Sequence, residues 1–176
     1  MMKIRTAIKE DAAGITKVHV ASWQAAYKDI LPEEFLKNIS FEHRLQSWSK
    51  ALDKPPSEHG IFVAVSDQEE ITGFATGGSN RSTDKFPQFE GELYAIYLLY
   101  SAWGKGVGEQ LTKSVVKKLG QDNINSMLIW VLADNPACGF YEKMGGIIVG
   151  KSEIQIAGGN YEELAYGWNN LQNLIK

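Results

Sequence analysis

The stretch YAIYLLYSAWGKGVG, residues 94–108, joins an apolar strand to a glycine-rich turn that opens an amphipathic helix. Its glycines, Gly104, Gly106 and Gly108, stand where backbone N–H groups and a helix N-terminus can face an anion. The apolar positions that follow repeat at helical spacing: Val107, Leu111, Val115 and Leu119. The pattern is typical of a cradle for a phosphate-bearing ligand.

Strand and helix patterns surround this stretch in a mixed order. Strands are expected at residues 3–8, 61–65, 71–76, 92–99, 126–132, 147–156 and 162–168. Helices are expected after Asp11, from Pro32, at 41–52, at 104–119 and from Pro136 to the Gly145-Gly146 pair. Residues 77–91, polar and rich in Gly and Ser, predict a long loop.

The two most apolar strands define the expected fold. Residues 92–99 and 126–132 are nearly continuous hydrophobic runs, which favours burial on both faces and parallel pairing across the helix between them. The other strands are expected to pair antiparallel. We therefore predict an α+β fold with a mixed central sheet of about seven strands, one parallel pair (the fourth and fifth) and about four flanking helices.

Composition restricts the classes of protein that fit. The 176 residues, 44% hydrophobic, suit a single domain over residues 1–176. A net charge of −3 gives no support to a nucleic-acid partner or an anionic membrane surface. Cys138 is the single cysteine, and no metal-ligand spacing occurs. With no signal-peptide pattern, we expect a cytoplasmic location and no bound metal.

Two familiar phosphate cradles do not match the turn. A P-loop requires Lys and Ser or Thr after its last glycine, whereas Lys105 lies inside this turn and Glu109 follows it. A dinucleotide fingerprint requires G-x-G-x-x-G, one residue longer than the spacing here, and lies near the start of its domain. Taken alone, the turn therefore fits either another kind of phosphate cradle or an ordinary tight turn at the start of a helix.

Residues 103–108, WGKGVG, resemble the Q/R-x-x-G-x-G/A motif of the GNAT superfamily of acetyl-CoA-dependent N-acetyltransferases, with Trp103 in place of the usual Gln or Arg. Residues 140–145, FYEKMG, resemble the F-Y-E-K-x-G segment of the same family, and residues 4–12 and 71–74 resemble its first strand and helix and its third strand. The resemblance covers most of the chain in the correct order. It implies acetyl-CoA as co-substrate and a primary amine as acceptor.

The resemblance also implies which residues contact the coenzyme. Backbone amides of the turn would hold the pyrophosphate, and a bulged strand would meet the pantetheine arm and the acetyl group. The expected set is Ile96, Tyr97, Leu98, Trp103, Gly104, Lys105, Gly106, Val107, Gly108, Glu109, Asn135 and Tyr141. Asn135 competes with Asp134 for its position, and either could instead cap the helix begun by Pro136.

Glu92 and Tyr141 are the expected catalytic pair. Glu92 precedes Trp103 by eleven positions, where family members that use a strand glutamate as base carry it; the alternative is an exposed carboxylate at a strand edge. The tyrosine of the family's F-Y pair reaches the coenzyme sulfur, which implies that Tyr141 is the acid; the alternative is a packed aromatic. Cys138 has no evident His partner and is interpreted as a small hydrophobic residue rather than a nucleophile.

The resemblance implies an acceptor site between the first two helices, the loop at 77–91 and the last hairpin. Trp23 and Tyr27 could form an aromatic wall for an amine, although core packing is the more common role for at least one of them. We predict an N-acetyltransferase that acts on a small-molecule amine in a ternary complex. A protein lysine or N-terminal acetyltransferase and a non-catalytic coenzyme A sensor are the alternatives, and a homodimer is left open.

Overall fold

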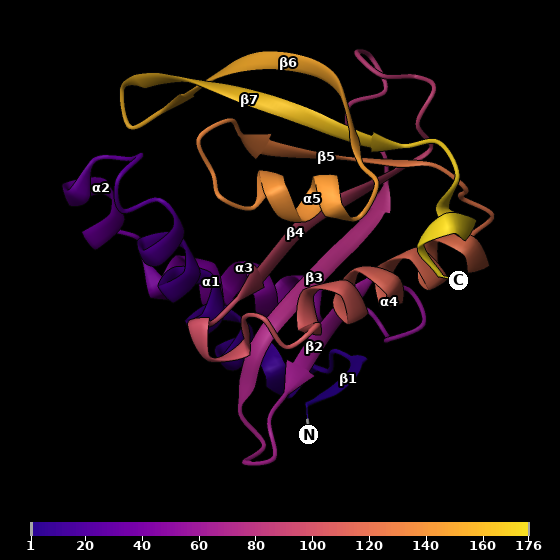
Figure 1. Cartoon of the computed structure of the whole chain (residues 1–176). Helices are drawn as coiled ribbons and strands as arrows, with labels where there is room; N and C mark the ends of the chain where they lie inside the picture. Colours follow the sequence, from indigo (N-terminus) through magenta and orange to yellow (C-terminus); the bar gives the residue numbers. More distant parts are fainter. Residues whose placement is uncertain (1, 176) are drawn as a thin grey trace.

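A computed structural model describes residues 2–175 and shows one seven-stranded mixed sheet in the order β1-β2-β3-β4-β5-β7-β6 (Figure 1). The strands are β1 (Lys3–Thr6), β2 (Ile61–Val65), β3 (Ile71–Ser79), β4 (Gly91–Leu98), β5 (Met127–Leu132), β6 (Ile147–Ile156) and β7 (Gly159–Trp168). Every neighbouring pair is antiparallel except β4 and β5, which are parallel. The predicted fold class and the position of its single parallel pair are confirmed.

Helices cover both faces of the sheet. They are α1 (Ala12–Ala26), α2 (Glu33–Lys37), α3 (Phe41–Ala51), α4 (Val107–Gln121) and α5 (Cys138–Lys143). In Figure 1, α4 and α5 lie in front of the sheet, and α1 to α3 gather at its other side. One hydrophobic core joins α4 and α5 to the sheet, and a second joins α1 and α3 to β2 and β3.

The predicted apolar stripe of α4 is the centre of the first core. Val107, Leu111, Val115 and Leu119 are each at most 2% exposed. They face Leu93 on β4 and Met127 and Ile129 on β5, in the same hydrophobic cluster. Because β4 leads into α4 and α4 into β5, this packing fixes where the glycine turn sits relative to the parallel pair.

Several boundaries differ from the sequence expectation, and the three largest differences concern α4, β3 and β7. The helix predicted from residue 104 begins at Val107, since Gly104 and Gly106 take positive φ angles that do not belong to a helix. Strand β3 runs on to Ser79, so the connecting loop is limited to residues 80–90. Strand β7 starts at Gly159 and pairs along its length with β6.

Asp11 occupies the N-cap position of α1, but its side chain makes no capping hydrogen bond to that helix. Its carboxylate pairs with the Arg5 guanidinium at 2.6 Å and accepts the Ile8 N–H at 2.8 Å. Burial alone would raise the pKa of Asp11, but these two donors outweigh it and lower the pKa. Asp11 therefore ties β1 to the start of the first helical segment.

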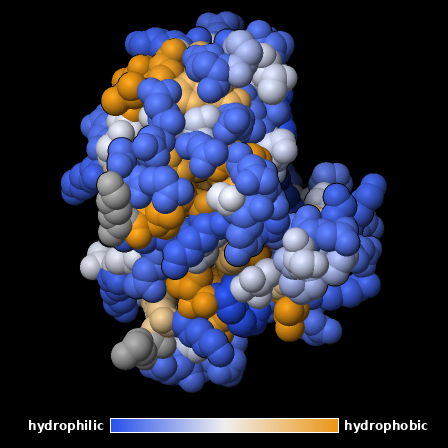
Figure 2. Space-filling model, turned by 90° about the vertical axis from the view of Figure 1, so that its right-hand side faces the viewer, coloured by the Kyte–Doolittle hydropathy of each residue, from blue (hydrophilic) through white to orange (hydrophobic). Residues whose placement is uncertain are grey.

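Hydrophilic residues dominate the face of the molecule drawn in Figure 2, and hydrophobic residues form separate patches on it. Within residues 2–175, no helix has the length and apolar character needed to cross a bilayer.

Gly77 is required by the close packing of β3 against α4. A Cβ at this position would lie 2.5 Å from Val115 Cγ1 and 2.8 Å from the Glu92 carbonyl oxygen. We expect Gly77→Ala to lower the free energy of unfolding by about 1–3 kcal/mol, as overpacked cores do. Gly120→Ala is the matched control, because no atom lies within 4 Å of its added Cβ; in a helix it should stabilise by about 0.5–1 kcal/mol. Equal effects of the two substitutions in urea denaturation would contradict this packing.

Candidate active site

The parallel strands β4 and β5 part immediately after they meet. They pair only at Gly91 with Met127 and Glu92 with Leu128. Beyond this point β5 pairs with β7 along residues 127–132, and β4 pairs with β3. The two strands diverge visibly in Figure 1. The second edge of β4 is therefore left without a strand partner from Leu93 onward.

The hydrogen-bond alternation of β4 decides which of its amides face this wedge. The Leu99 N–H donates to the Thr72 carbonyl in β3 at 2.8 Å. Because antiparallel partners alternate, the Tyr97 N–H also faces β3, whereas the N–H groups of Ile96 and Leu98 face the wedge. A register shift between Thr76 and Gly77 leaves Tyr94 as an extra residue on β4, which is the bulge that the family resemblance implied.

The glycine turn lies beside the wide end of the wedge. Gly104 and Gly106 have φ angles of 69° and 73°, where an L-residue with a side chain would be strained by roughly 1–2 kcal/mol. Gly106 is the N-cap of α4, and no side chain caps this helix end. The first helical bond runs from the Gln110 N–H to the Gly106 carbonyl. The N–H groups of residues 107–109 therefore have no helical acceptor and can bind an anion.

Trp103 fastens the turn to β4. Its indole N–H donates to the Leu98 carbonyl at 3.1 Å, and the Ser22 hydroxyl approaches the same oxygen at 3.4 Å. Trp103 is about half exposed. The residue that departs from the family motif thus keeps a defined position, with its polar atom directed to the strand rather than to solvent.

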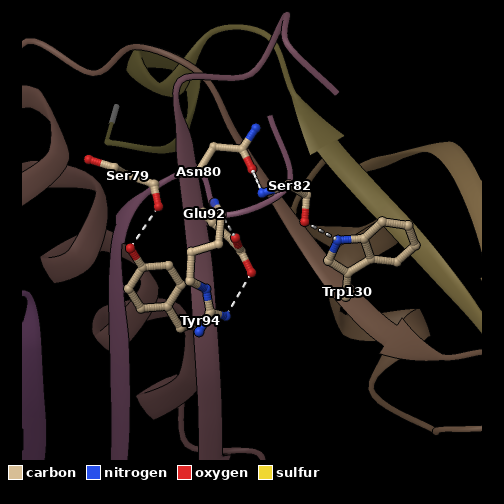
Figure 3. Close-up of polar contacts among 7 residues, drawn as sticks. Ser79, Asn80, Ser82, Glu92, Tyr94 and Trp130 are labelled. Carbon is tan, nitrogen blue, oxygen red and sulfur yellow. Dashed lines mark hydrogen bonds and ion pairs between the residues drawn. The ribbon is translucent and has the colours of Figure 1, made fainter. Parts of the chain in front are cut away.

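Glu92 lies at the narrow end of the wedge and is 4% exposed. Its Oε2 accepts the Arg81 backbone N–H at 2.9 Å, and its Oε1 pairs with the Arg81 guanidinium at 2.8 Å. That guanidinium also lies over the Tyr94 ring, 3.9 Å from its centroid. Figure 3 shows the carboxylate between Tyr94 and Trp130. Since a carboxylate offers about four acceptor positions, Glu92 retains capacity for a further donor.

The loop that carries Arg81 is organised by Asn80. The buried Asn80 amide donates to the Phe86 and Phe89 carbonyls, both at 2.9 Å, and its oxygen accepts the Ser82 N–H at 2.7 Å. The Ser82 hydroxyl in turn accepts the Trp130 indole N–H at 3.1 Å (Figure 3). These bonds hold the loop over β4 and β5 and present Arg81 to Glu92.

Tyr141 lies on α5, where its ring approaches the Tyr166 and Trp168 rings of β7, and it is 4% exposed. Burial raises the pKa of its hydroxyl, and the nearby Tyr27 and Cys138 add to the shift. The group is therefore a neutral phenol that donates hydrogen bonds. Among the described residues its hydroxyl has no hydrogen-bond partner.

Three tyrosines approach the wedge from different elements. Burial raises the pKa of Tyr97, with additional contributions from the neighbouring Tyr27 and Tyr141. The Tyr97 ring stacks on His19, with centroids 5.3 Å apart. Tyr27, which directly follows α1, is itself buried and belongs to the small core around Leu31 and Leu36. Side chains from α1, β4 and α5 therefore meet here, although they are far apart in the sequence.

Some expected coenzyme contacts have other partners. Asn135 is buried; its oxygen accepts the Ala137 N–H at 2.9 Å and its amide donates to the Tyr27 hydroxyl at 3.3 Å. Asn135 therefore closes a turn just before α5, whose N-cap is Ala137 with no side-chain cap, and its contact with the coenzyme stays a prediction. Val107 is a core side chain, so its backbone alone faces the cradle. Lys105 is exposed, and Glu109 pairs with Lys113 at 2.8 Å.

Burial raises the pKa of the Cys138 thiol, which favours the uncharged form. Its sulfur lies 3.6 Å from the Leu132 carbonyl oxygen. This environment agrees with a structural cysteine and not with an activated nucleophile.

A cavity of about 440 Å³ opens beside Glu92. It is lined by Arg81, Ser82, Lys85, Glu92, Tyr94, Trp130 and Glu163. Trp23 and Tyr27, the acceptor residues expected from sequence, are not among these lining residues. Arg81 and Lys85 belong to the loop that the family resemblance pointed to, but nothing in the sequence singles them out. In the sequence, Trp130 has the pattern of an ordinary strand residue, and Glu163 has that of a solvent-exposed strand residue.

The seven-stranded mixed sheet with its one parallel pair matches the fold of solved N-acetyltransferase structures. A family model described as the acetyltransferase (GNAT) family matches residues 19–146, and the chain belongs to this family of acyltransferases.

Known proteins support this assignment along the whole chain. It is 34% identical over 174 residues to the Bacillus subtilis protein named uncharacterized N-acetyltransferase YuaI, covering 99% of this chain and 96% of that one. A mycothiol acetyltransferase of Paenarthrobacter aurescens is 30% identical over 87 residues, 49% of this chain and 27% of its own length. The structure of yncA from Salmonella typhimurium with acetyl-CoA superposes with a TM-score of 0.70 at 20% identity, covering 97% and 94% of the two chains.

Asn80 should control the position of Arg81. Asn80→Ala removes the side-chain hydrogen bonds to the Phe86 and Phe89 carbonyls and from the Ser82 N–H. The Phe86 carbonyl keeps the Phe89 N–H, so the Phe89 carbonyl and the Ser82 N–H are the groups left without a partner among the described residues, each a loss of about 1–3 kcal/mol. We expect exchange of the Arg81 amide hydrogen to accelerate by roughly ten- to a hundredfold, since 1.4 kcal/mol corresponds to a factor of ten. Asn125→Ala is the control, because the exposed Asn125 side chain donates only to the Asn123 carbonyl. An unchanged Arg81 exchange rate in Asn80→Ala would show that the loop does not depend on this residue.

Proposed function

We propose that this chain transfers an acetyl group from acetyl-CoA to a primary amine of a small molecule, by direct attack within a ternary complex. The observation that carries the proposal is the wedge itself. A free strand edge and an uncapped helix N-terminus adjoin at one end, and a buried carboxylate faces a cavity at the other. Family membership and the acetyl-CoA in the Salmonella typhimurium structure support the same donor.

The described residues fit acetyl-CoA. The uncapped N–H groups of residues 107–109, with Gly104 and Gly106 open to close approach, suit a pyrophosphate. The wedge-facing amides of Ile96 and Leu98 suit the carbonyl groups of an extended chain and of a thioester. When bound, the coenzyme supplies an acetyl thioester whose carbonyl carbon is the electrophile.

Glu92 is assigned as the base. A free alkylamine has a pKa of about 10, so the acceptor arrives as an ammonium that must lose a proton before its nitrogen can attack. Glu92 Oε1 or Oε2 takes this proton, directly or through a water, from an amine held in the adjacent cavity. The N–H groups of Ile96 and Leu98 then stabilise the negative charge on the carbonyl oxygen.

Tyr141 is assigned as the acid. As nitrogen bonds to the carbonyl carbon and the carbon–sulfur bond breaks, the electron pair of that bond remains on the coenzyme sulfur, and the nitrogen loses its second proton to that sulfur or to solvent. A neutral phenol with no internal partner can donate its hydrogen bond to this sulfur. Full proton transfer is not required, because the bond stabilises the thiolate.

The cavity is large enough for a small acceptor. A volume of about 440 Å³ is in the range of small-molecule sites. The mycothiol acetyltransferase that resembles half of this chain is named for a small molecule. A cytoplasmic location, a single domain and a homodimeric or monomeric state are compatible with this function.

The proposal is tested by thiol release from acetyl-CoA against a panel of amines. Glu92→Gln should lower kcat/KM by roughly 100- to 10,000-fold near neutral pH, the usual contribution of general acid–base catalysis, and should need higher pH for turnover. Acetyl-CoA affinity, measured by calorimetry, should be retained, because Glu92 lies away from the cradle. Tyr141→Phe should lower kcat without moving the pH dependence.

Two outcomes would redirect the assignment. An unchanged pH–rate profile in Glu92→Gln would remove Glu92 as the base. Coenzyme binding with no thiol release for any amine would favour a sensor that does not turn over.

A further inference from the structure

The cavity beside Glu92 carries balanced charge. Its lining includes two cations, Arg81 and Lys85, and two carboxylates, Glu92 and Glu163. An acceptor with an ammonium as its only charge would upset this balance and compete with the cations for the carboxylates. An acceptor that brings one positive and one negative group would preserve it.

Only one of the two cations is committed to a carboxylate. Arg81 is held by Glu92 through its guanidinium and its backbone N–H. Lys85 has no carboxylate within ion-pair distance among the described residues. Its ammonium donates to the Ser152 hydroxyl at 3.3 Å and lies 5.6 Å from the centroid of the Trp130 ring. Lys85 is therefore the cation that can receive an anionic group from a ligand.

Glu163 stands near this lysine without neutralising it. Burial raises the pKa of Glu163, and the charge of Lys85 acts in the opposite direction. No hydrogen bond to the Glu163 carboxylate is found in the described part of the chain. The charges of Lys85 and Glu163 thus influence one another, although the two groups form no ion pair among the described residues.

The aromatic walls set the orientation of such a ligand. Tyr94 lies beneath the Arg81 guanidinium, and Trp130 lies beside Lys85. Both rings flank Glu92 in Figure 3. A ligand between them would place its amine toward the buried carboxylate and its anionic end toward Lys85 at the rim.

Resting on the proposed function, we infer that the acceptor is a small amino-acid-like molecule with a primary amine and a carboxylate, and that Lys85 binds the carboxylate and determines this specificity. A carboxylate fits the balance because its single negative charge cancels that of the ammonium. A phosphate monoester, at about −1.5 to −2, would leave an excess.

The test compares amines that differ only by a carboxylate. L-phenylalanine with phenethylamine, L-tyrosine with tyramine, and L-lysine with cadaverine are assayed for thiol release from acetyl-CoA. For at least one pair, kcat/KM should favour the carboxylate-bearing member by about tenfold or more, equivalent to roughly 1.4 kcal/mol. Lys85→Met should abolish that preference by raising KM for the amino acid, with kcat and the paired amine nearly unchanged.

Two further variants separate binding from damage to the fold. Lys85→Arg keeps the positive charge and should keep the preference. Lys117→Met removes an exposed lysine from α4, outside this cavity, and should change neither substrate.

The results distinguish a failure of carboxylate selection by Lys85 from a failure of the proposed acetyltransferase function. If the decarboxylated amines are equal or better acceptors, or if Lys85→Met leaves the preference intact, Lys85 does not select a carboxylate, while amine acetylation stands. If no amine of either kind releases thiol, the proposed function itself fails, and this inference fails with it.

Discussion

The parting of β4 and β5 is the constraint on which the rest of the site depends. A strand edge inside a folded domain normally has its N–H groups paired, because each orphaned group is unfavourable by about 1–3 kcal/mol. Here the pairing stops after Glu92, and the amides of Ile96 and Leu98 are left facing a wedge. The arrangement persists because each strand is fully paired on its other side, β4 with β3 and β5 with β7. The N–H groups of Ile96 and Leu98 are therefore free of a strand partner and can bind a ligand.

The pieces around the wedge are fixed to it by separate contacts. Trp103 ties the glycine turn to the Leu98 carbonyl, so the helix N-terminus and the strand edge form one unit. At the opposite end, the loop built on Asn80 brings Arg81 to Glu92 and covers the cavity. Donor and acceptor sides of the site therefore meet at β4 but depend on different parts of the chain.

Local patterns in the sequence predicted much of this architecture, and long-range contacts could not be predicted. The stripe from Val107 to Leu119, the β2–β3 pair and the sheet class follow from periodicity alone. The Arg81–Glu92 pair does not, since it depends on a loop folding back over a strand. The extent of β3 was missed for a related reason. Glycine at position 77 looks like a loop residue until Val115 of α4 is seen against it.

The exchange of individual β4 amides with solvent tests the central claim most directly. Hydrogen exchange by NMR would be followed with and without acetyl-CoA. We predict that bound acetyl-CoA slows the exchange of the backbone amide hydrogens of Ile96, Leu98 and residues 107–109. The Tyr97 amide, already bonded to β3, should change little. If the coenzyme protects none of these wedge-facing amides, or protects Tyr97 in preference to its neighbours, the wedge is not the acetyl-CoA site.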